Sequence, residues 1–358
     1  MTPIRNAFCL PGTRINRRTT GFGFYGPEGQ VLANTAIRTS IWQTDPPSNA
    51  LPPRESTRLF GPALFAGSVD KQFGFILLNA LGRLWALEHL PPETTLVYAA
   101  KPQARPPSFA VLPAILASLG LSHRILVTET AMSFDALYTA EERFGEVFDG
   151  RGRPEFYDWL DTRWPASAPP DPDNRLYVTR SGLGPAAGRY ACEDHLEALL
   201  AAEGYRIFAP EAHSIAEQVA AFQAAGRLIF AEGSALHLFA LLRRPGQISA
   251  VIHRREALPE VMQVQMADRP GAPTLAINAV SELWWPPQRG DHLGLSVLDF
   301  DLLGQALRAS GLIEGAGWRA PDKAAEMHSL QLGLAPDEKL MTGAERAKWL
   351  KALRARKG

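Results

Sequence analysis

Arg180, Ser181 and Gly182 follow a short apolar run at residues 176–178 and precede a segment with helical periodicity at residues 193–202. Strand-to-helix turns of this kind bind anions through main-chain amides and the helix N-terminus. An arginine at the turn adds a cation that can form two parallel hydrogen bonds to a diphosphate. The pattern therefore predicts phosphate binding by these three residues, with a structural ion pair of Arg180 as the alternative.

A second turn of this kind lies within residues 228–255, which read as strand, turn, helix and strand. Gly233 permits close approach of a ligand to the main chain, and Ser234 can cap the helix or contact a phosphate. Glu232 would repel a phosphate, so we expect it to contact a sugar hydroxyl or a cation, and we also consider it as a catalytic base. His237 either borders the bound nucleotide or lies on a packed helix face.

Residues 73–87 carry apolar side chains at helical spacing and predict one long buried helix that ends near His89. Asn79 and Arg83 are four residues apart and share a face of that helix. They form either part of an acceptor site or a buried hydrogen-bonded pair. Asp70 and Lys71 precede the helix in a loop, where Asp70 is a second candidate for the catalytic base and Lys71 an acceptor-side residue.

The chain as a whole alternates strand-like and helix-like segments, which is typical of α/β proteins with covered parallel sheets. We predict an N-terminal domain at residues 1–150 with an irregular, β-rich start to about residue 66. A proline-rich linker at residues 151–173 leads to a second α/β domain at residues 174–310 and a C-terminal tail at residues 311–358. Two such halves place a ligand cleft between them.

Further expected elements follow from the same periodicity. In the first half they are a helix at 109–119 and strands at 95–99 and 124–127. In the second half they are strands at 176–179, 205–208, 228–231 and 248–252 and helices at 193–202, 215–225 and 235–242.

The tail contains a basic helix, introduced by a predicted capping box of Thr342 and Glu345. This helix either rests on an anionic membrane surface or packs against the N-terminal domain. Upstream, Trp284 and Trp285 form either a stacking platform for a sugar ring or part of a core.

Composition excludes several classes of protein. Lys plus Arg and Asp plus Glu number 37 each, so no overall field indicates a nucleic-acid partner. Cys9 and Cys192 fit neither a disulfide framework nor a zinc site, and no metal or cofactor is expected. No apolar stretch reaches the roughly 18 residues of a membrane span, and the N-terminus has no apolar signal region. We expect a cytoplasmic protein, at the inner face of the membrane if the basic helix binds lipid.

Four segments in order resemble motifs of glycosyltransferase family 61, a group often described as capsular polysaccharide biosynthesis proteins. They are GFILLNALGRLWAL from Gly74, YVTRSGL from Tyr177, EALLAAEGYRIFAPEAHSIAEQVAAFQAAGRLIFA from Glu197 and EGSALHLFALLRRPG from Glu232. The resemblance implies a GT-B-like fold, in which two Rossmann-like domains face each other across a cleft. The second domain would hold most of a nucleotide-sugar donor and the first most of the acceptor.

The resemblance also implies inverting, metal-independent transfer of a sugar from a nucleotide-diphospho-sugar to a polysaccharide or lipid-linked glycan. Arg180 would bind the departing diphosphate together with the amides of Gly233 and Ser234. Phe75 stands where many relatives have histidine and Asn79 where many have an acid, so a base is expected elsewhere, with Asp70 as a candidate.

Two alternatives stay open. One is a catalytically silent sugar-nucleotide-binding protein in glycan assembly. The other is an NAD(P)-dependent oxidoreductase that uses the glycines after Arg180, with Glu203 at a ribose.

Overall fold

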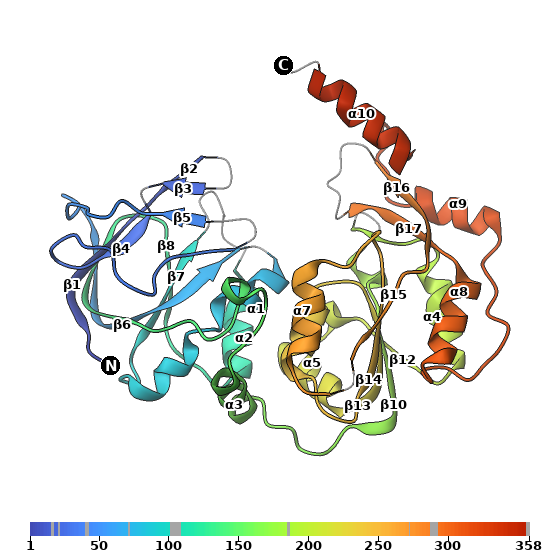
Figure 1. Cartoon of the computed structure of the whole chain (residues 1–358), viewed down its shortest axis with the longest axis horizontal. Coiled ribbons are helices and arrows are strands. Elements are labelled where there is room, and N and C mark those ends of the chain that lie inside the picture. Colours follow the sequence, from blue (N-terminus) through green and yellow to red (C-terminus); the bar gives the residue numbers. More distant parts are fainter. Residues whose placement is uncertain are drawn as a thin grey trace. The chain divides into compact units, whose positions relative to one another are not determined.

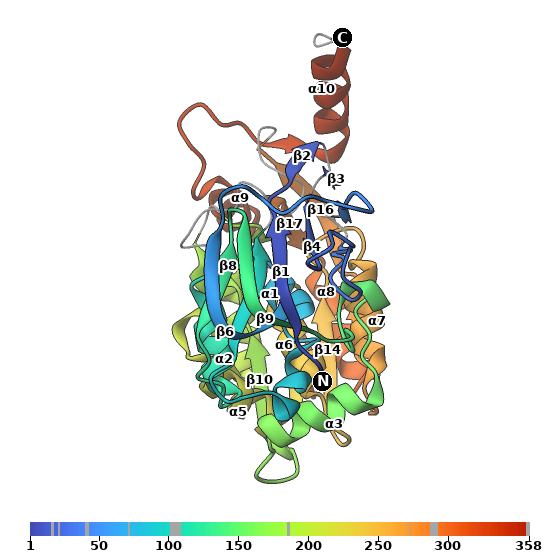
Figure 2. The ribbon, with the colours of Figure 1, turned by 90° about the vertical axis from the view of Figure 1, so that its left-hand side faces the viewer.

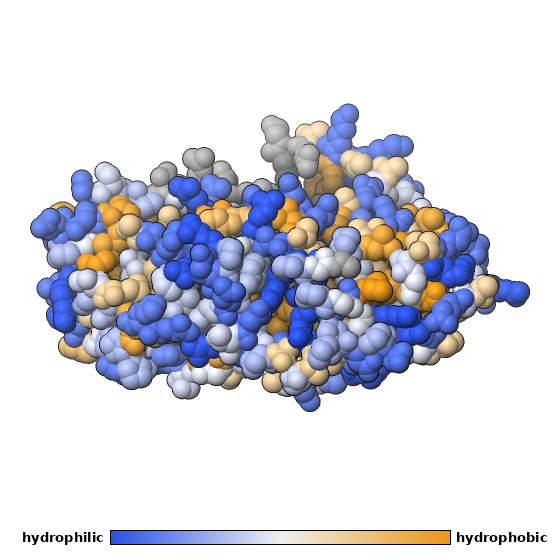
Figure 3. All heavy atoms as spheres, turned by 60° about the horizontal axis from the view of Figure 1, so that its bottom comes forward, coloured by the Kyte–Doolittle hydropathy of each residue, from blue (hydrophilic) through white to orange (hydrophobic). Residues whose placement is uncertain are grey.

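The chain divides into two compact units, Met1–Pro165 and Ala166–Gly358 (Figure 1). The computed structural model describes all residues except 16–17, 21, 40–42, 71, 101–108, 185–186, 272, 287–292 and 356–358. Among the described helices, none is long and apolar enough to cross a membrane. Hydrophilic residues cover most of the face drawn in Figure 3, with hydrophobic residues in small scattered patches.

The first unit is built on a six-stranded mixed sheet in the order β4-β1-β9-β6-β7-β8. Its strands are β1 (Ile4–Leu10), β4 (Gly23–Tyr25), β6 (Thr57–Val69), β7 (Thr95–Ala100), β8 (Ile125–Thr128) and β9 (Met132–Thr139). The last four run parallel, as the sequence predicts for this half. β1 runs antiparallel to both of its neighbours, so the expectation of a wholly parallel sheet is wrong at this edge.

Aromatic side chains from separate strands fill the core of this sheet. The ring of Phe24 in β4 lies 4.6 Å from that of Phe65 in β6 and 6.0 Å from that of Phe134 in β9, between centroids. A small second sheet of β2 (Thr13–Ile15), β3 (Arg18–Thr20) and β5 (Gln43–Asp45) belongs to the same unit. The β-rich start of the chain is therefore confirmed, although β6 is much longer than the short strands expected before residue 66.

The long helix expected at residues 73–87 is broken into α1 (Phe73–Ala80) and a 3-10 helix, η1 (Leu84–His89). Gly82 lies in the break, where a Cβ atom would collide with the main-chain oxygen of Phe144. The Leu84 amide donates to the Leu81 carbonyl at 3.0 Å, which tightens the turn. Apolar spacing is similar on both sides of this break, so the pattern could not reveal it.

The remaining helices of the first unit are α2 (Val111–Ser118), η2 (Glu146–Phe148) and α3 (Pro154–Arg163). α3 lies within the segment expected as a linker, and it buries Phe156, Trp159 and Leu160.

The second unit contains a five-stranded sheet in the order β12-β10-β13-β14-β15, with every pair parallel. The strands are β10 (Asp171–Val178), β12 (Arg206–Phe208), β13 (Ala225–Ala231), β14 (Ile248–Ile252) and β15 (Leu275–Ile277). Numbered along the chain, this is the doubly wound order 2-1-3-4-5. The order reverses between β10 and β13, and ligands of such sheets bind at the carboxyl ends of the strands at that point.

Helices cover both faces of this sheet (Figure 1). α4 (Glu193–Ala202) and α8 (Phe300–Ala309) share one core with Tyr177, Ile229 and Ile252. α5 (Ile215–Ala224), α6 (Ala235–Leu242) and α7 (Glu260–Asp268) lie on the other face, where the rings of Phe222, Phe230 and Phe239 meet. The α/β fold predicted for this half is confirmed element by element.

A four-stranded sheet completes the second unit in the order β11-β17-β16-β18. Its strands are β11 (Arg189–Tyr190), β16 (Val280–Trp285), β17 (Leu295–Leu298) and β18 (Met341–Thr342), followed by α10 (Gly343–Ala355); α9 (Lys323–Gln331) precedes β18. The capping box is confirmed, since the Thr342 amide donates to Glu345 Oε2 at 2.9 Å and the Glu345 amide to Thr342 Oγ1 at 3.3 Å. α10 extends away from this sheet in both ribbon views (Figures 1 and 2), and both interpretations of the basic helix stay predictions.

Candidate functional site

Three turns meet at the carboxyl edge of the parallel sheet in the second unit. They follow the neighbouring strands β10, β13 and β14, in which Val178 is paired with Phe230 and Ala231 with Ile252. Their residues are Thr179 and Arg180, Glu232 to Ser234, and His253 to Arg255. The point at which the strand order reverses therefore carries the residues that the sequence pattern selected for phosphate binding.

Arg180 lies directly over the main chain of Gly233, because a Cβ atom at residue 233 would occupy the place of its Nη1 atom. The Arg180 Nη2 atom donates to the Gly188 carbonyl at 3.2 Å, and its Nε makes no hydrogen bond with the described residues. Within that part of the chain no carboxylate forms an ion pair with this guanidinium. The geometry favours anion binding over the structural ion pair.

Arg254 supplies a second cation at this edge, which the sequence pattern had not singled out. Its side chain is buried, and burial together with the positive charge of Arg180 lowers its pKa to about 10. Burial also lowers the pKa of the neighbouring His253, so this imidazole is neutral at pH 7. Two like charges held together at a sheet edge are stabilised by a bound anion. The signal in the sequence is His253-Arg254-Arg255, which directly follows the apolar strand at residues 248–252.

Glu232 is fully buried and joins two of these turns. Its Oε2 atom accepts from the Arg254 amide at 2.8 Å, and its Oε1 atom accepts from Arg255 Nε at 2.5 Å. Arg255 Nη2 completes an ion pair with the same carboxylate. The expected contact with a cation is thus present, and the burial of Glu232 favours an anchoring role over that of a catalytic base.

Ser181 and Gly182 both lie against acidic side chains. The Ser181 hydroxyl donates to Glu197 Oε1 in α4 at 2.6 Å, and Gly182 lies against the carboxylate of Glu211. A phosphate beside these acids would be repelled, so the geometry gives the two residues a role in the shape of the turn.

His237 and Ser234 both lie at the start of α6, but their surroundings differ. The His237 ring is buried, and its Nδ1 atom lies 2.7 Å from Gln265 Oε1 in α7. The structure therefore favours the packed helix face for His237. Ser234 is half-buried at the start of α6, and its side chain makes no capping hydrogen bond within the described part of the chain. Its hydroxyl is available to a ligand.

The acceptor-side candidates lie in the first unit, apart from Lys71, which falls outside the described residues. Asn79 Nδ2 donates to Glu146 Oε2 at 3.2 Å, and Arg83 Nη2 donates to Glu142 Oε2 at 2.9 Å. Asn79 and Arg83 are both buried, and each holds a carboxylate instead of pairing with the other. Burial raises the pKa of Glu142, and the charge of Arg83 opposes that rise.

Asp70 is half-buried at the carboxyl end of the parallel strand β6. The sequence does not indicate Glu142 and Glu146, because Glu142 lies in a loop and Glu146 in the three-residue helix η2, both too short for a periodic pattern.

Residues 71–248 match the model of the family described as Glycosyltransferase 61. The chain belongs to this family. The protein is therefore a glycosyltransferase, an enzyme that takes a sugar donor and an acceptor. The comparison with curated proteins gave no match. The matched range begins next to α1 and ends at the first residue of β14, so it includes Arg180 and Gly233 and stops before Arg254.

A buried carboxylate fixes the Arg180 turn of this glycosyltransferase. Glu193 Oε1 accepts from the Arg180 amide at 2.8 Å, the Thr179 hydroxyl at 2.9 Å and the Tyr177 hydroxyl at 3.2 Å. Burial raises the pKa of Glu193, although the hydrogen bonds from Arg180 and Thr179 lower it in part. Because α4 begins at this residue, Glu193 ties the turn to the helix that follows it.

The raised pKa of Glu193 predicts a pH dependence of stability. The folded protein binds the proton more readily than the unfolded chain, so Glu193 destabilises the fold increasingly as pH rises from about 4.5 through the raised pKa. We expect Glu193→Gln to gain stability relative to the parent protein between pH 4 and pH 7, as measured by urea unfolding at both pH values. Glu217, whose pKa is lowered by its bonds to Ser214, gives the control. Glu217→Gln should lose stability relative to the parent over the same range. If the stability of both variants changed with pH in the same direction relative to the parent, the raised pKa of Glu193 would be contradicted.

Proposed function

We propose that this glycosyltransferase binds a nucleotide-diphospho-sugar at the carboxyl edge of β10, β13 and β14 and transfers its sugar to a polysaccharide or lipid-linked glycan. The observation that carries the proposal is the position of Arg180 over Gly233 where the strand order reverses, with the buried Arg254 in the turn after β14. Two cations and a side-chain-free stretch of main chain suit the diphosphate of such a donor.

The chemistry of inverting transfer places specific demands on these residues. A base takes the proton of an acceptor hydroxyl, whose oxygen attacks the anomeric carbon while the bond to the diphosphate breaks. The electron pair of that bond leaves with the diphosphate, so negative charge grows where Arg180 and Arg254 lie. Positive groups fixed in advance at that place lower the barrier. In this proposal arginines supply the charge, and the Gly233 and Ser234 amides add hydrogen bonds.

The base is proposed in the first unit. Asp70 follows the carboxyl end of β6, and its carboxylate is half-buried. Glu232 is the weaker candidate because it is buried in its pair with Arg255. A GT-B-like arrangement, with the acceptor bound by the first unit and the donor by the second, is part of the same proposal. The doubly wound sheet of the second unit supports it.

Thermal unfolding in the presence of nucleotides tests the donor class. A ligand at 100 times its Kd stabilises the folded state by about 2.7 kcal/mol. We expect stabilisation by at least one of UDP-glucose, UDP-N-acetylglucosamine or GDP-mannose, each of which carries a diphosphate, and none by NAD or NADP. Stabilisation by NAD or NADP and by none of these donors would contradict the proposed donor class. Donor binding without donor hydrolysis or transfer to any acceptor would contradict the proposed transfer reaction.

A further inference from the structure

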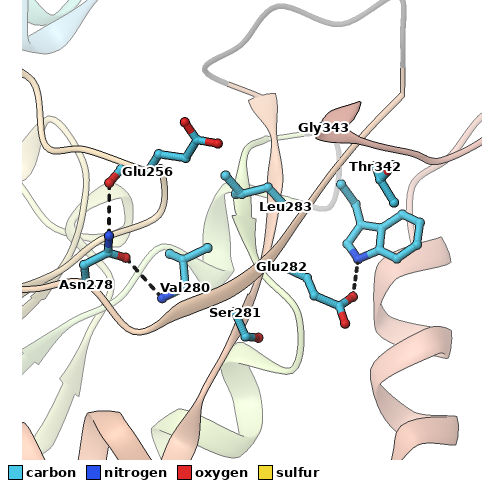
Figure 4. Close-up of a pocket in the computed structure, with 9 residues that line it drawn as sticks. Glu256, Asn278, Val280, Ser281, Glu282, Leu283, Thr342 and Gly343 are labelled. Atoms are coloured by element: carbon cyan, nitrogen blue, oxygen red, sulfur yellow. Dashed lines mark hydrogen bonds between the residues drawn. The ribbon is translucent and has the colours of Figure 1, made fainter. Parts of the chain in front are cut away.

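A pocket of about 340 Å³ lies in the second unit, outside the residues that match the family (Figure 4). Its walls come from the turn after β14, the turn after β15, the strand β16 and the junction of β18 with α10. The lining residues are Glu256, Asn278, Val280, Ser281, Glu282, Leu283, Trp284, Thr342 and Gly343. This volume falls at the lower end of the range of about 300–1,000 Å³ that is typical of small-molecule sites.

The pocket adjoins the proposed diphosphate site through the chain itself. Glu256 directly follows Arg255, and Asn278 directly follows the last residue of β15. The two turns are tied together, because Asn278 Nδ2 donates to the Glu256 carbonyl at 3.0 Å. Asn278 Oδ1 accepts from the Val280 amide at 3.2 Å, so the side chain is held at both ends (Figure 4).

The side chains that line the pocket select against phosphate. They include two carboxylates, Glu256 and Glu282, and none of them is Lys, Arg or His. The Glu282 carboxylate is held in place by the Trp284 indole, whose Nε1 donates to Glu282 Oε2 at 2.9 Å (Figure 4). A fixed carboxylate accepts hydrogen bonds from hydroxyl groups, and a half-buried indole offers a flat apolar face.

We propose that this pocket binds a neutral, hydroxyl-rich ring next to the diphosphate site. The ring is either a pyranose of a glycan substrate or the ribose of the donor nucleoside, since both present hydroxyl donors and an apolar C–H face. Glu282 and Glu256 accept from the hydroxyls, and Trp284 packs on the ring. The proposal rests on the proposed function only in making this ring part of the substrate of the glycosyltransferase.

Ligands without phosphate test the pocket separately from the diphosphate site. Saturation-transfer NMR would be recorded on the full chain with methyl glycosides of glucose, galactose, mannose and N-acetylglucosamine, and with uridine, guanosine and cytidine. We expect at least one of these compounds to bind. Trp284→Ala and the isosteric Glu282→Gln should each weaken that binding by about fivefold, the loss expected for one hydrogen bond or ring contact.

Two matched variants make the outcome decisive. Trp349→Ala removes a half-buried indole from α10 and Arg319→Ala removes an exposed arginine, both outside the pocket lining, and both should leave binding of the phosphate-free compounds unchanged. Binding of glycosides identifies a glycan ring, and binding of nucleosides identifies the ribose. Absence of binding by every compound, or binding that survives both Trp284→Ala and Glu282→Gln, would overturn the proposal. If a glycoside or nucleoside binds but no nucleotide-sugar does, the proposed ring site is supported and the proposed donor function is contradicted.

Discussion

Replacing Arg180 with alanine is expected to weaken binding of a nucleotide-diphospho-sugar by about 1.5–3 kcal/mol, the range for hydrogen bonds to charged groups. This loss corresponds to a roughly 10- to 150-fold higher Kd. The reason is geometric, because Arg180 lies over Gly233 with its Nε atom uncommitted among the described residues. Isothermal titration calorimetry with the donor that stabilises the protein most would measure the change.

Two further variants separate geometry from charge. Arg180→Lys keeps the positive charge but loses the planar fork, so it should recover only part of the affinity. Arg319→Ala removes an exposed arginine of the same unit and should leave the Kd unchanged. Wild-type affinity in Arg180→Ala would remove this residue from the donor site.

Replacing Arg255 with alanine is expected to lower the free energy of unfolding by about 3 kcal/mol, near the low end of the range for a broken buried ion pair. The variant leaves the carboxylate of Glu232 fully buried without its cation. The cost stays at that end because the Arg255 side chain is 30% exposed and its partner is 0% exposed. Urea unfolding at pH 7 would measure it.

The double variant Glu232→Gln with Arg255→Ala removes both charges and should regain much of the loss, since no buried charge remains. Arg153→Ala is the matched control, because the Arg153–Glu141 pair is exposed at both ends and should contribute less than about 1 kcal/mol. If Arg153→Ala and Arg255→Ala lowered the free energy of unfolding equally, burial of the Glu232–Arg255 pair would add nothing to its contribution to stability.

Local sequence signals are sufficient to predict the bounds of an element where that element is buried and is flanked by turn residues. α4, α6 and β14 begin and end where the periodicity predicts, the last two separated by Pro245 and Gly246. The Pro, Gly, Arg and Thr content of residues 1–66 predicts loops and short strands, and Gly61 and Pro62 lie within β6. In the structure the strand continues past them with an irregular register between Leu59 and Pro62. The antiparallel position of β1 depends on pairing with β9, more than a hundred residues away, which no local pattern encodes.

The candidate site was predictable only in part, for a related reason. Residue type and spacing identify Arg180 and Gly233, because any turn that binds phosphate needs a cation and a bare main chain. The direction of Ser181 and His237 depends on Glu197 and Gln265, which come from other helices. The approach of Arg254 to Arg180 follows from the strand order, because β13 alone separates β10 from β14.

The junction of β18 with α10 bears on which part of the chain is needed for substrate recognition. Thr342 and Gly343 form one wall of the pocket, and Thr342 pairs with Trp284 across the four-stranded sheet. A chain shortened before Met341 would keep all five parallel strands and the three turns at their carboxyl edge. It would lose a wall of the pocket and the strand that supports Trp284. If the pocket binds the proposed ring, truncation would remove selection of the ring and keep anchoring of the diphosphate, and the C-terminal segment would be a determinant of specificity.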